Sequence, residues 1–150
     1  MYHFRITLHA APADPVSTSE QHSGGRTLRS LNLSATQLAQ SQFNCTFEEA
    51  ISRLEALDRM FVEPDGSFVW VAPKDEPPWQ VDGNLYDRAG KLQYIDIGGT
   101  CPANSFNQLI AACGWPEQRI VVHLMEHGIV VDEAYFRRLA SEEPLASEER

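Results

Sequence analysis

Cysteine is scarce in this 150-residue sequence: only Cys45, Cys101 and Cys113 occur, and no two of them form a C-x-x-C pair. An odd number of widely spaced cysteines argues against a disulfide framework and favours reduced thiols in a cytoplasm. No segment approaches the ~20 consecutive apolar residues that span a bilayer. The N-terminal MYHFRITLHAAP lacks the cationic start and apolar run of a secretory signal. We therefore expect a soluble, cytoplasmic protein that does not contact membranes.

Positive charge is also scarce, since 12 Lys and Arg stand against 21 Asp and Glu and give a net charge of −9. Such a chain repels phosphate backbones and anionic headgroups, so nucleic acid is not an expected partner. The sequence contains no internal repeat. Its length suits one domain over residues 1–150, which buries roughly two-thirds of its unfolded surface.

Apolar and polar residues alternate from Tyr2 to His9, which predicts a strand. The segment 11–28 that follows is rich in Pro, Ser and Gly and has no periodicity, so it predicts a flexible exposed loop. The acidic end, SEEPLASEER, predicts a frayed tail at 141–150.

Four helices are expected. The capping boxes at 34–37 and 46–49 each predict a helix start. After the second box, apolar residues recur at helical spacing up to Phe61 and predict a stripe that faces the core. A third helix should end at Gly114, and a fourth should run from Asp132 through Leu139.

Two hairpins are expected around tight turns, one in FVEPDGSFVWV and one in WQVDGNLYDRAGKLQYIDI. The prolines of APKDEPPW, between these hairpins, must run outside the sheet. We therefore predict an α+β fold: a mostly antiparallel sheet built from hairpins, with three to four helices packed mainly on one face.

The stretch His123-Leu-Met-Glu126-His127 spells H-x-x-E-H. On a helix, both imidazoles would share a face and could bind zinc while Glu126 activates a water. This five-residue pattern resembles the metal-binding helix of the inverted zinc peptidases, which implies a small metal-dependent hydrolase. On a strand, alternation separates Glu126 from the two histidines. The β-branched runs on either side favour a hairpin over residues 116–131, and the helix stays an alternative.

Cys101 lies in Gly98-Gly-Thr-Cys-Pro102, where a strand gives way to a helix. A helix start can lower a thiol pKa, so a thiol-dependent hydrolase is a second enzymatic hypothesis. A nucleophilic cysteine also needs a base, and no histidine lies nearby in the chain. We favour a structural residue at a helix cap. The glycine pair matches no nucleotide-binding motif, and no cofactor is expected.

Residues 31–72, which begin LNLSATQLAQSQFNCTFEEAISRLEALDRMFVEPDGSFVWV, form a predicted short helix, a longer helix and a hairpin around Asp65-Gly66. This order resembles part of a winged-helix domain and implies a regulator as a third hypothesis. However, the helix from Thr46 to Met60 holds four acidic residues against two arginines. DNA would repel this surface.

Five large aromatic residues fall on or beside predicted strands: Trp70, Trp79, Trp115, Tyr86 and Tyr94. An exposed tryptophan next to the proline-rich segment would make a good binding anchor. The order of elements in a small acidic chain is similar to that of type III secretion chaperones, which bind partner proteins as dimers. Our first hypothesis is therefore a non-enzymatic protein that binds another protein, or a second copy as a homodimer, through sheet edges or exposed aromatics.

Overall fold

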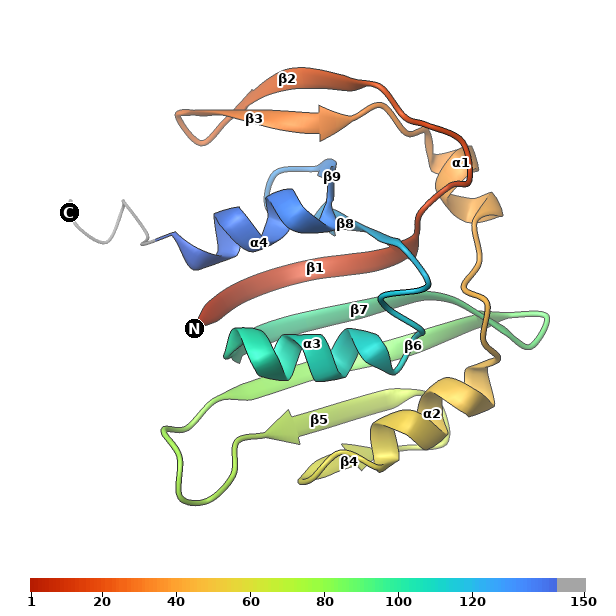
Figure 1. Cartoon of the computed structure of the whole chain (residues 1–150), viewed down its shortest axis with the longest axis vertical. Helices are drawn as coiled ribbons and strands as arrows, with labels where there is room; N and C mark the ends of the chain where they lie inside the picture. The colour runs from red at the N-terminus through yellow and green to blue at the C-terminus, as the bar shows by residue number, and fades with distance from the viewer. Residues whose placement is uncertain (143–150) are drawn as a thin grey trace.

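The computed structural model describes residues 1–142. Its main sheet has seven antiparallel strands (Figure 1), which lie in the spatial order β4 (Met60–Val62), β5 (Ser67–Val71), β6 (Gln80–Arg88), β7 (Lys91–Cys101), β1 (Tyr2–Ala10), β8 (Ile120–Leu124) and β9 (Ile129–Asp132). A separate hairpin consists of β2 (Thr18–Ser23) and β3 (Arg26–Leu31). The helices are α1 (Ala35–Gln40), α2 (Phe47–Glu55), α3 (Ala103–Ala111) and α4 (Glu133–Ser141). The predicted α+β fold is confirmed.

Three of the four helices begin at a side-chain cap. In the first capping box, the Ser34 hydroxyl accepts a hydrogen bond from the Gln37 N–H at 3.1 Å, and the Gln37 side chain accepts one from the Ser34 N–H at 2.8 Å. The box at Thr46 and Glu49 closes in the same way. At the start of α4, the Asp132 carboxylate accepts a hydrogen bond from the Tyr135 N–H at 2.7 Å. These side chains satisfy N–H groups that the first helical turn leaves free.

Both predicted hairpins are confirmed, as β4–β5 and β6–β7. Residues 120–132 form a third hairpin, β8–β9, so the interpretation favoured for this region is confirmed too. The turn that joins β8 to β9 contains Gly128 at φ 68°, a conformation that glycine adopts at little cost. The β-branched runs thus determine the local structure here, as expected from their preference for strands.

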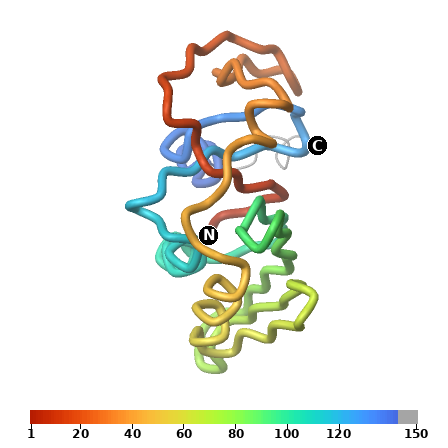
Figure 2. The backbone as a smooth tube through the Cα atoms, turned by 90° about the vertical axis from the view of Figure 1, so that its right-hand side faces the viewer, coloured from red at the N-terminus to blue at the C-terminus, as the bar shows by residue number. Residues whose placement is uncertain are grey.

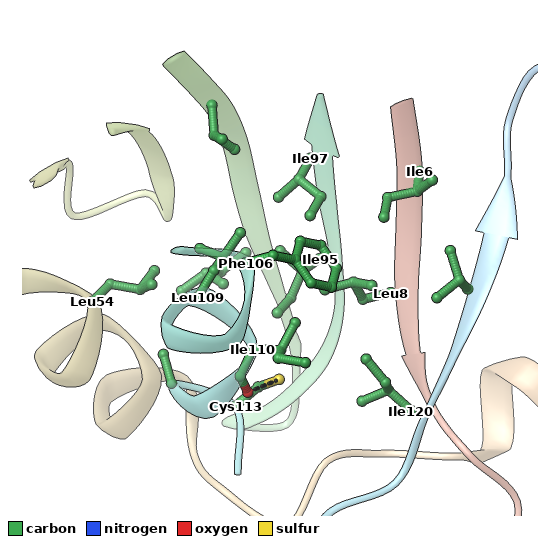
Figure 3. Packing of buried hydrophobic residues seen from close by; sticks show 14 of the residues in the cluster. Ile6, Leu8, Leu54, Ile95, Ile97, Phe106, Leu109, Ile110, Cys113 and Ile120 are labelled. Atoms are coloured by element: carbon green, nitrogen blue, oxygen red, sulfur yellow. Dashed lines mark hydrogen bonds between the residues drawn. The ribbon is translucent and has the colours of Figure 1, made fainter. Parts of the chain in front are cut away.

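The three helices α2, α3 and α4 cover one face of the sheet, as predicted (Figure 2). Figure 3 shows the centre of this layer, where Phe106, Leu109 and Ile110 of α3 point toward the strands. The Phe106 side chain is fully buried and its ring meets those of Tyr2 and Phe4 edge-on, with centroids 5.7 and 5.6 Å away. The alternate residues of the strands therefore point to the opposite face.

Helix α1 lies on that opposite face, at the β8–β9 end of the sheet. Its Leu38 packs with Val121 and Val130, which alternate with core residues of β8 and β9. Ala11, Leu31 and Leu33 complete this small cluster. The cluster covers one end of the opposite face, and the strands from β4 to β1 lie outside it.

The prediction of a loop over residues 11–28 is wrong for its second half, because residues 18–31 form the β2–β3 hairpin. Its strands are mostly polar and exposed, so their sequence has no apolar periodicity. Tertiary contacts hold the hairpin instead: the Ser23 hydroxyl lies 2.7 Å from His127 Nδ1, and the Arg29 N–H donates to the Tyr135 hydroxyl at 3.2 Å. Of the predicted frayed tail, residues 143–150 lie outside the described residues.

Two further expectations need correction. The hairpin that would form the wing of a winged helix belongs to the main sheet, because β5 pairs with β6 along its whole length. Phe61, expected on the core stripe of a long helix, lies in β4 and is 61% exposed, since α2 already ends at Glu55. Within residues 1–142, no helix is long and apolar enough to cross a membrane.

Candidate functional site

The H-x-x-E-H residues do not lie on a helix. His123 belongs to β8, where it is the Cα partner of Thr7, whereas Glu126 and His127 lie in the turn before β9. The His127 ring is hydrogen-bonded to Ser23. The helical interpretation, and with it the peptidase resemblance, is therefore wrong for residues 120–132. Among residues 1–142, no three His, Cys, Asp or Glu side chains come together in a group that could hold a metal ion.

Cys101 is the last residue of β7 and its side chain is fully buried. The N-cap of α3 is Pro102, so the expectation that Cys101 occupies a helix cap is wrong. Burial raises the pKa of the Cys101 thiol to about 12. The thiol therefore stays protonated at neutral pH, and the arrangement does not supply the thiolate that a nucleophile requires.

We expect Cys101 in the native protein to react with iodoacetamide roughly 10³-fold more slowly than a free cysteine at neutral pH, because its thiolate is scarce and shielded. Cys45 and Cys113 are also buried and should react slowly. Mass spectrometry of the alkylated protein at successive times measures the three rates. The same reaction in urea is the control, where all three thiols should react rapidly. Fast alkylation of native Cys101 would restore the thiol hypothesis.

The tryptophans do not provide the expected exposed anchor. Trp70 and Trp79 are only 3% and 7% exposed, and their rings meet edge-on at 5.0 Å in the core. Trp115 is half-buried and its indole N–H donates to Glu133 at 2.9 Å. In the described part of the chain, the exposed Phe and Tyr side chains are Phe61 and Tyr86, and both lie on the sheet face opposite to α2, α3 and α4.

We call this surface the open face. It is the side of β4, β5, β6, β7 and β1 that points away from the three helices, together with His123 and Met125. One row of Cα partners crosses it from Phe61 through Val69, Asp82 and Gly98 to Arg5. Val69 is 38% exposed at one side of this row. At the other side, the Arg5 guanidinium lies over Gly98, where a Cβ atom would be 3.2 Å from its Cζ.

The middle row of the open face contains Asp96, Thr7 and His123 as successive partners. The Thr7 hydroxyl donates to Asp96 Oδ1 at 2.7 Å and lies 3.5 Å from the sulfur of Met125. Met125 thus lies over Thr7 and is still 49% exposed. This row supplies one fixed negative charge beside an adaptable apolar side chain.

A stack of three rings forms the next row. Tyr86 and Tyr94 stack with centroids 4.5 Å apart, and Tyr94 stacks on His9 at 5.7 Å. Tyr86 is 37% exposed at the outer end of the stack. Burial, and to a smaller extent the neighbouring His123, lower the pKa of the inner His9 to about 4, and Asp96 only partly opposes this shift. The Nδ1 atom of His9 is buried without a hydrogen-bond partner among the described residues, which fits a neutral ring.

This shift predicts acid sensitivity. The pKa of His9 is about 4 in the folded chain and near 6.5 in the unfolded chain. The contribution of this shift to the free energy of unfolding is therefore complete above pH 6.5. It is lost as the pH falls from 6.5 to 4, on the order of 2 kcal/mol by pH 5. Urea unfolding at pH 7 and pH 5 measures the loss. His9→Phe keeps a ring on Tyr94 and cannot titrate, so the free energy of unfolding of this variant should fall less between pH 7 and pH 5. An equal fall in the variant and the wild type would contradict the assignment of this acid sensitivity to His9.

The open face holds most of the large hydrophobic side chains that are exposed in the described residues. Five large hydrophobic side chains are exposed among residues 1–142, and four of them, Phe61, Val69, Tyr86 and Met125, belong to the open face. Sequence reasoning singled out Tyr86 but not the other three. Alternation could have identified Val69, which stands between the core residues Phe68 and Trp70.

We compared the chain with protein-family models, with curated proteins and with solved structures, and none of the three comparisons finds a match.

Proposed function

We propose that this protein is a non-enzymatic binding protein whose open face docks onto another protein. The observation that carries the proposal is the grouping of Phe61, Val69, Tyr86 and Met125 on the one sheet face that α2, α3 and α4 leave uncovered. Grouped exposed apolar side chains mark interaction sites, and aromatic residues and methionine are enriched at interfaces. Single exposed apolar residues scattered over the surface would carry no such meaning.

Charge indicates the chemistry of the partner. The chain carries a net charge of −9, and on the open face the two aspartates Asp82 and Asp96 stand against Arg5. A complementary partner therefore presents apolar side chains flanked by Lys or Arg. A second copy of this chain carries the same negative charge, and nucleic acid carries phosphates, so both fit less well.

The experiment that tests the proposal places a photo-cross-linking residue, p-benzoylphenylalanine, at Tyr86 and, separately, at Val69 in cells that make the protein. The matched control places it at Glu55, which is exposed on α2 and therefore on the helix side. We expect the same partner protein to be cross-linked from Tyr86 and Val69 and not from Glu55. Cross-linking at equal yield from all three positions would contradict the proposal.

Sedimentation equilibrium of the purified protein distinguishes a different partner protein from a second copy of this chain. We expect a monomer over the accessible concentration range, because two copies with a net charge of −9 repel each other. A dimer that Tyr86→Glu dissociates would instead identify a second copy as the occupant of the open face.

A further inference from the structure

On the side of β1 that faces β8, only the C-terminal half of the strand is paired. Strand β7 pairs with β1 from Tyr2 to His9, whereas β8 pairs with it only from Ile6 to Ala10, because β8 ends at Leu124. Within residues 1–142, the N-terminal half of β1 therefore has a strand on one side only. Helix α4 runs alongside this half (Figure 1), and its Phe136 ring meets those of Tyr2 and Phe4 edge-on.

The backbone groups of His3 point toward the vacant side. On the β8 side, the Arg5 carbonyl accepts a hydrogen bond from the Met125 N–H at 3.3 Å, and the Ala11 N–H donates to the Arg119 carbonyl at 2.9 Å. Because backbone groups alternate in direction along a strand, the odd-numbered residues share this side. Among residues 1–142, no backbone group pairs with His3 there. Its N–H and C=O are free to bind another chain.

A pocket of about 130 Å³ opens beside this free edge. The apolar part of its lining comes from β1, β3, β8 and α4 and includes Phe4, Leu28, Leu124, Phe136 and Leu139, whereas Arg26, Glu126 and His127 contribute to its polar part. A cavity of ~150 Å³ can hold a benzene molecule, so this pocket has room for one aliphatic side chain.

We propose that the free half of β1 binds a short extended segment of another polypeptide, which continues the line of β8 and places one aliphatic side chain in the pocket. In this binding mode, main-chain hydrogen bonds supply affinity and pockets for alternate side chains supply specificity. The free groups of His3 and the adjoining pocket provide both parts. Of the four apolar residues that carry the proposed function, this inference uses only the backbone N–H of Met125, so it stands apart from the proposed function.

The rim of the pocket favours a basic segment. Three charged residues line the pocket: Glu126 is exposed at the rim, the positive charge of Arg26 is already paired with Glu142 at 2.7 Å, and the Arg5 guanidinium lies over Gly98 on the open face. The net charge of −9 adds a long-range attraction for cations. Residues on either side of the buried aliphatic one should therefore include Lys or Arg.

The test uses an acetylated and amidated hexapeptide, Thr-Lys-Thr-Leu-Thr-Lys, labelled with a fluorophore and titrated with the full-length protein. A second peptide differs only in N-methyl groups on the two residues that flank the leucine, which remove backbone donors. We expect the first peptide to bind and the methylated one to bind about tenfold more weakly, because it can no longer donate a hydrogen bond to the His3 carbonyl. No detectable binding of either peptide, or equal binding of both, would overturn the proposal.

Variants of the protein locate the site. His3→Pro removes the backbone N–H that points toward the vacant side of β1 and should weaken binding of the first peptide about tenfold. His3→Ala keeps that N–H, so this variant should bind the first peptide with wild-type affinity. Ala140→Leu keeps a good helix former in α4, places a larger side chain at the pocket wall and should also weaken binding. If His3→Pro does not fold, Ala140→Leu carries the test. Wild-type affinity in both Ala140→Leu and a folded His3→Pro would overturn the assignment. Tyr86→Glu, which alters the open face, should leave peptide binding unchanged.

Discussion

Replacing Gly99 by alanine is expected to lower the free energy of unfolding by about 4 kcal/mol. Gly99 has φ +134°, and a Cβ atom there would lie 2.2 Å from the Gln80 carbonyl oxygen and 3.1 Å from the Val81 Cα. The strained backbone conformation costs roughly 1–3 kcal/mol. The overlap adds a similar amount, because backbone atoms of β6 cannot rotate away as a side chain can. Urea denaturation of the wild type and the variant measures the difference.

The neighbouring glycine is the matched control. A Cβ atom at Gly98 would meet only the guanidinium of Arg5, at 3.2 Å, and this flexible group can move aside. Gly98→Ala should therefore change the free energy of unfolding by less than about 1 kcal/mol. Equal losses in the two variants would contradict the close approach of β6 and β7 at Gly99.

The substitution Phe106→Ala is expected to cost about 3–5 kcal/mol, the range found when a buried phenylalanine leaves a cavity. The Phe106 side chain is fully buried at the centre of the layer between α3 and the sheet, and its ring lies 5.3 Å from that of Phe136. These neighbours belong to separate elements that hold one another apart, so the cavity cannot close easily. The measurement is again the free energy of unfolding in urea.

Phe61→Ala is the same substitution on the other side of the sheet. Because the Phe61 side chain is 61% exposed, its removal should change the free energy of unfolding by no more than about 0.5 kcal/mol. The pair of variants therefore reports which face is packed and which is open. A loss at Phe61 as large as that at Phe106 would mean that the open face is buried in the folded protein.

Local chemistry explains which parts of the fold could be predicted. The capping boxes at Ser34 and Thr46 and the Asp132 cap involve residues three apart, so the sequence alone specifies them. The tight turns and β-branched runs likewise determine the three hairpins that follow α2. Each of these features depends on neighbours in the chain.

The remaining features depend on contacts between distant residues. The β2–β3 hairpin is held by His127 and Tyr135, more than a hundred positions along the chain. Phe61 is exposed because α2 ends at Glu55 and β4 pairs with β5. Helical periodicity alone predicts a core position for this residue. The open face itself exists because α2, α3 and α4 all pack on one side, which no single segment determines.

The most direct test of the binding role is a calorimetric titration of the partner identified by cross-linking with the wild type, Tyr86→Glu and Glu55→Lys. Tyr86 is an exposed aromatic within the open face, and loss of such a hot-spot residue costs about 2 kcal/mol of binding energy. We expect affinity to fall roughly 30-fold in Tyr86→Glu. Affinity for Glu55→Lys, which alters only the helix side, should match that of the wild type. Equal affinities for all three proteins would contradict the open face as the binding surface.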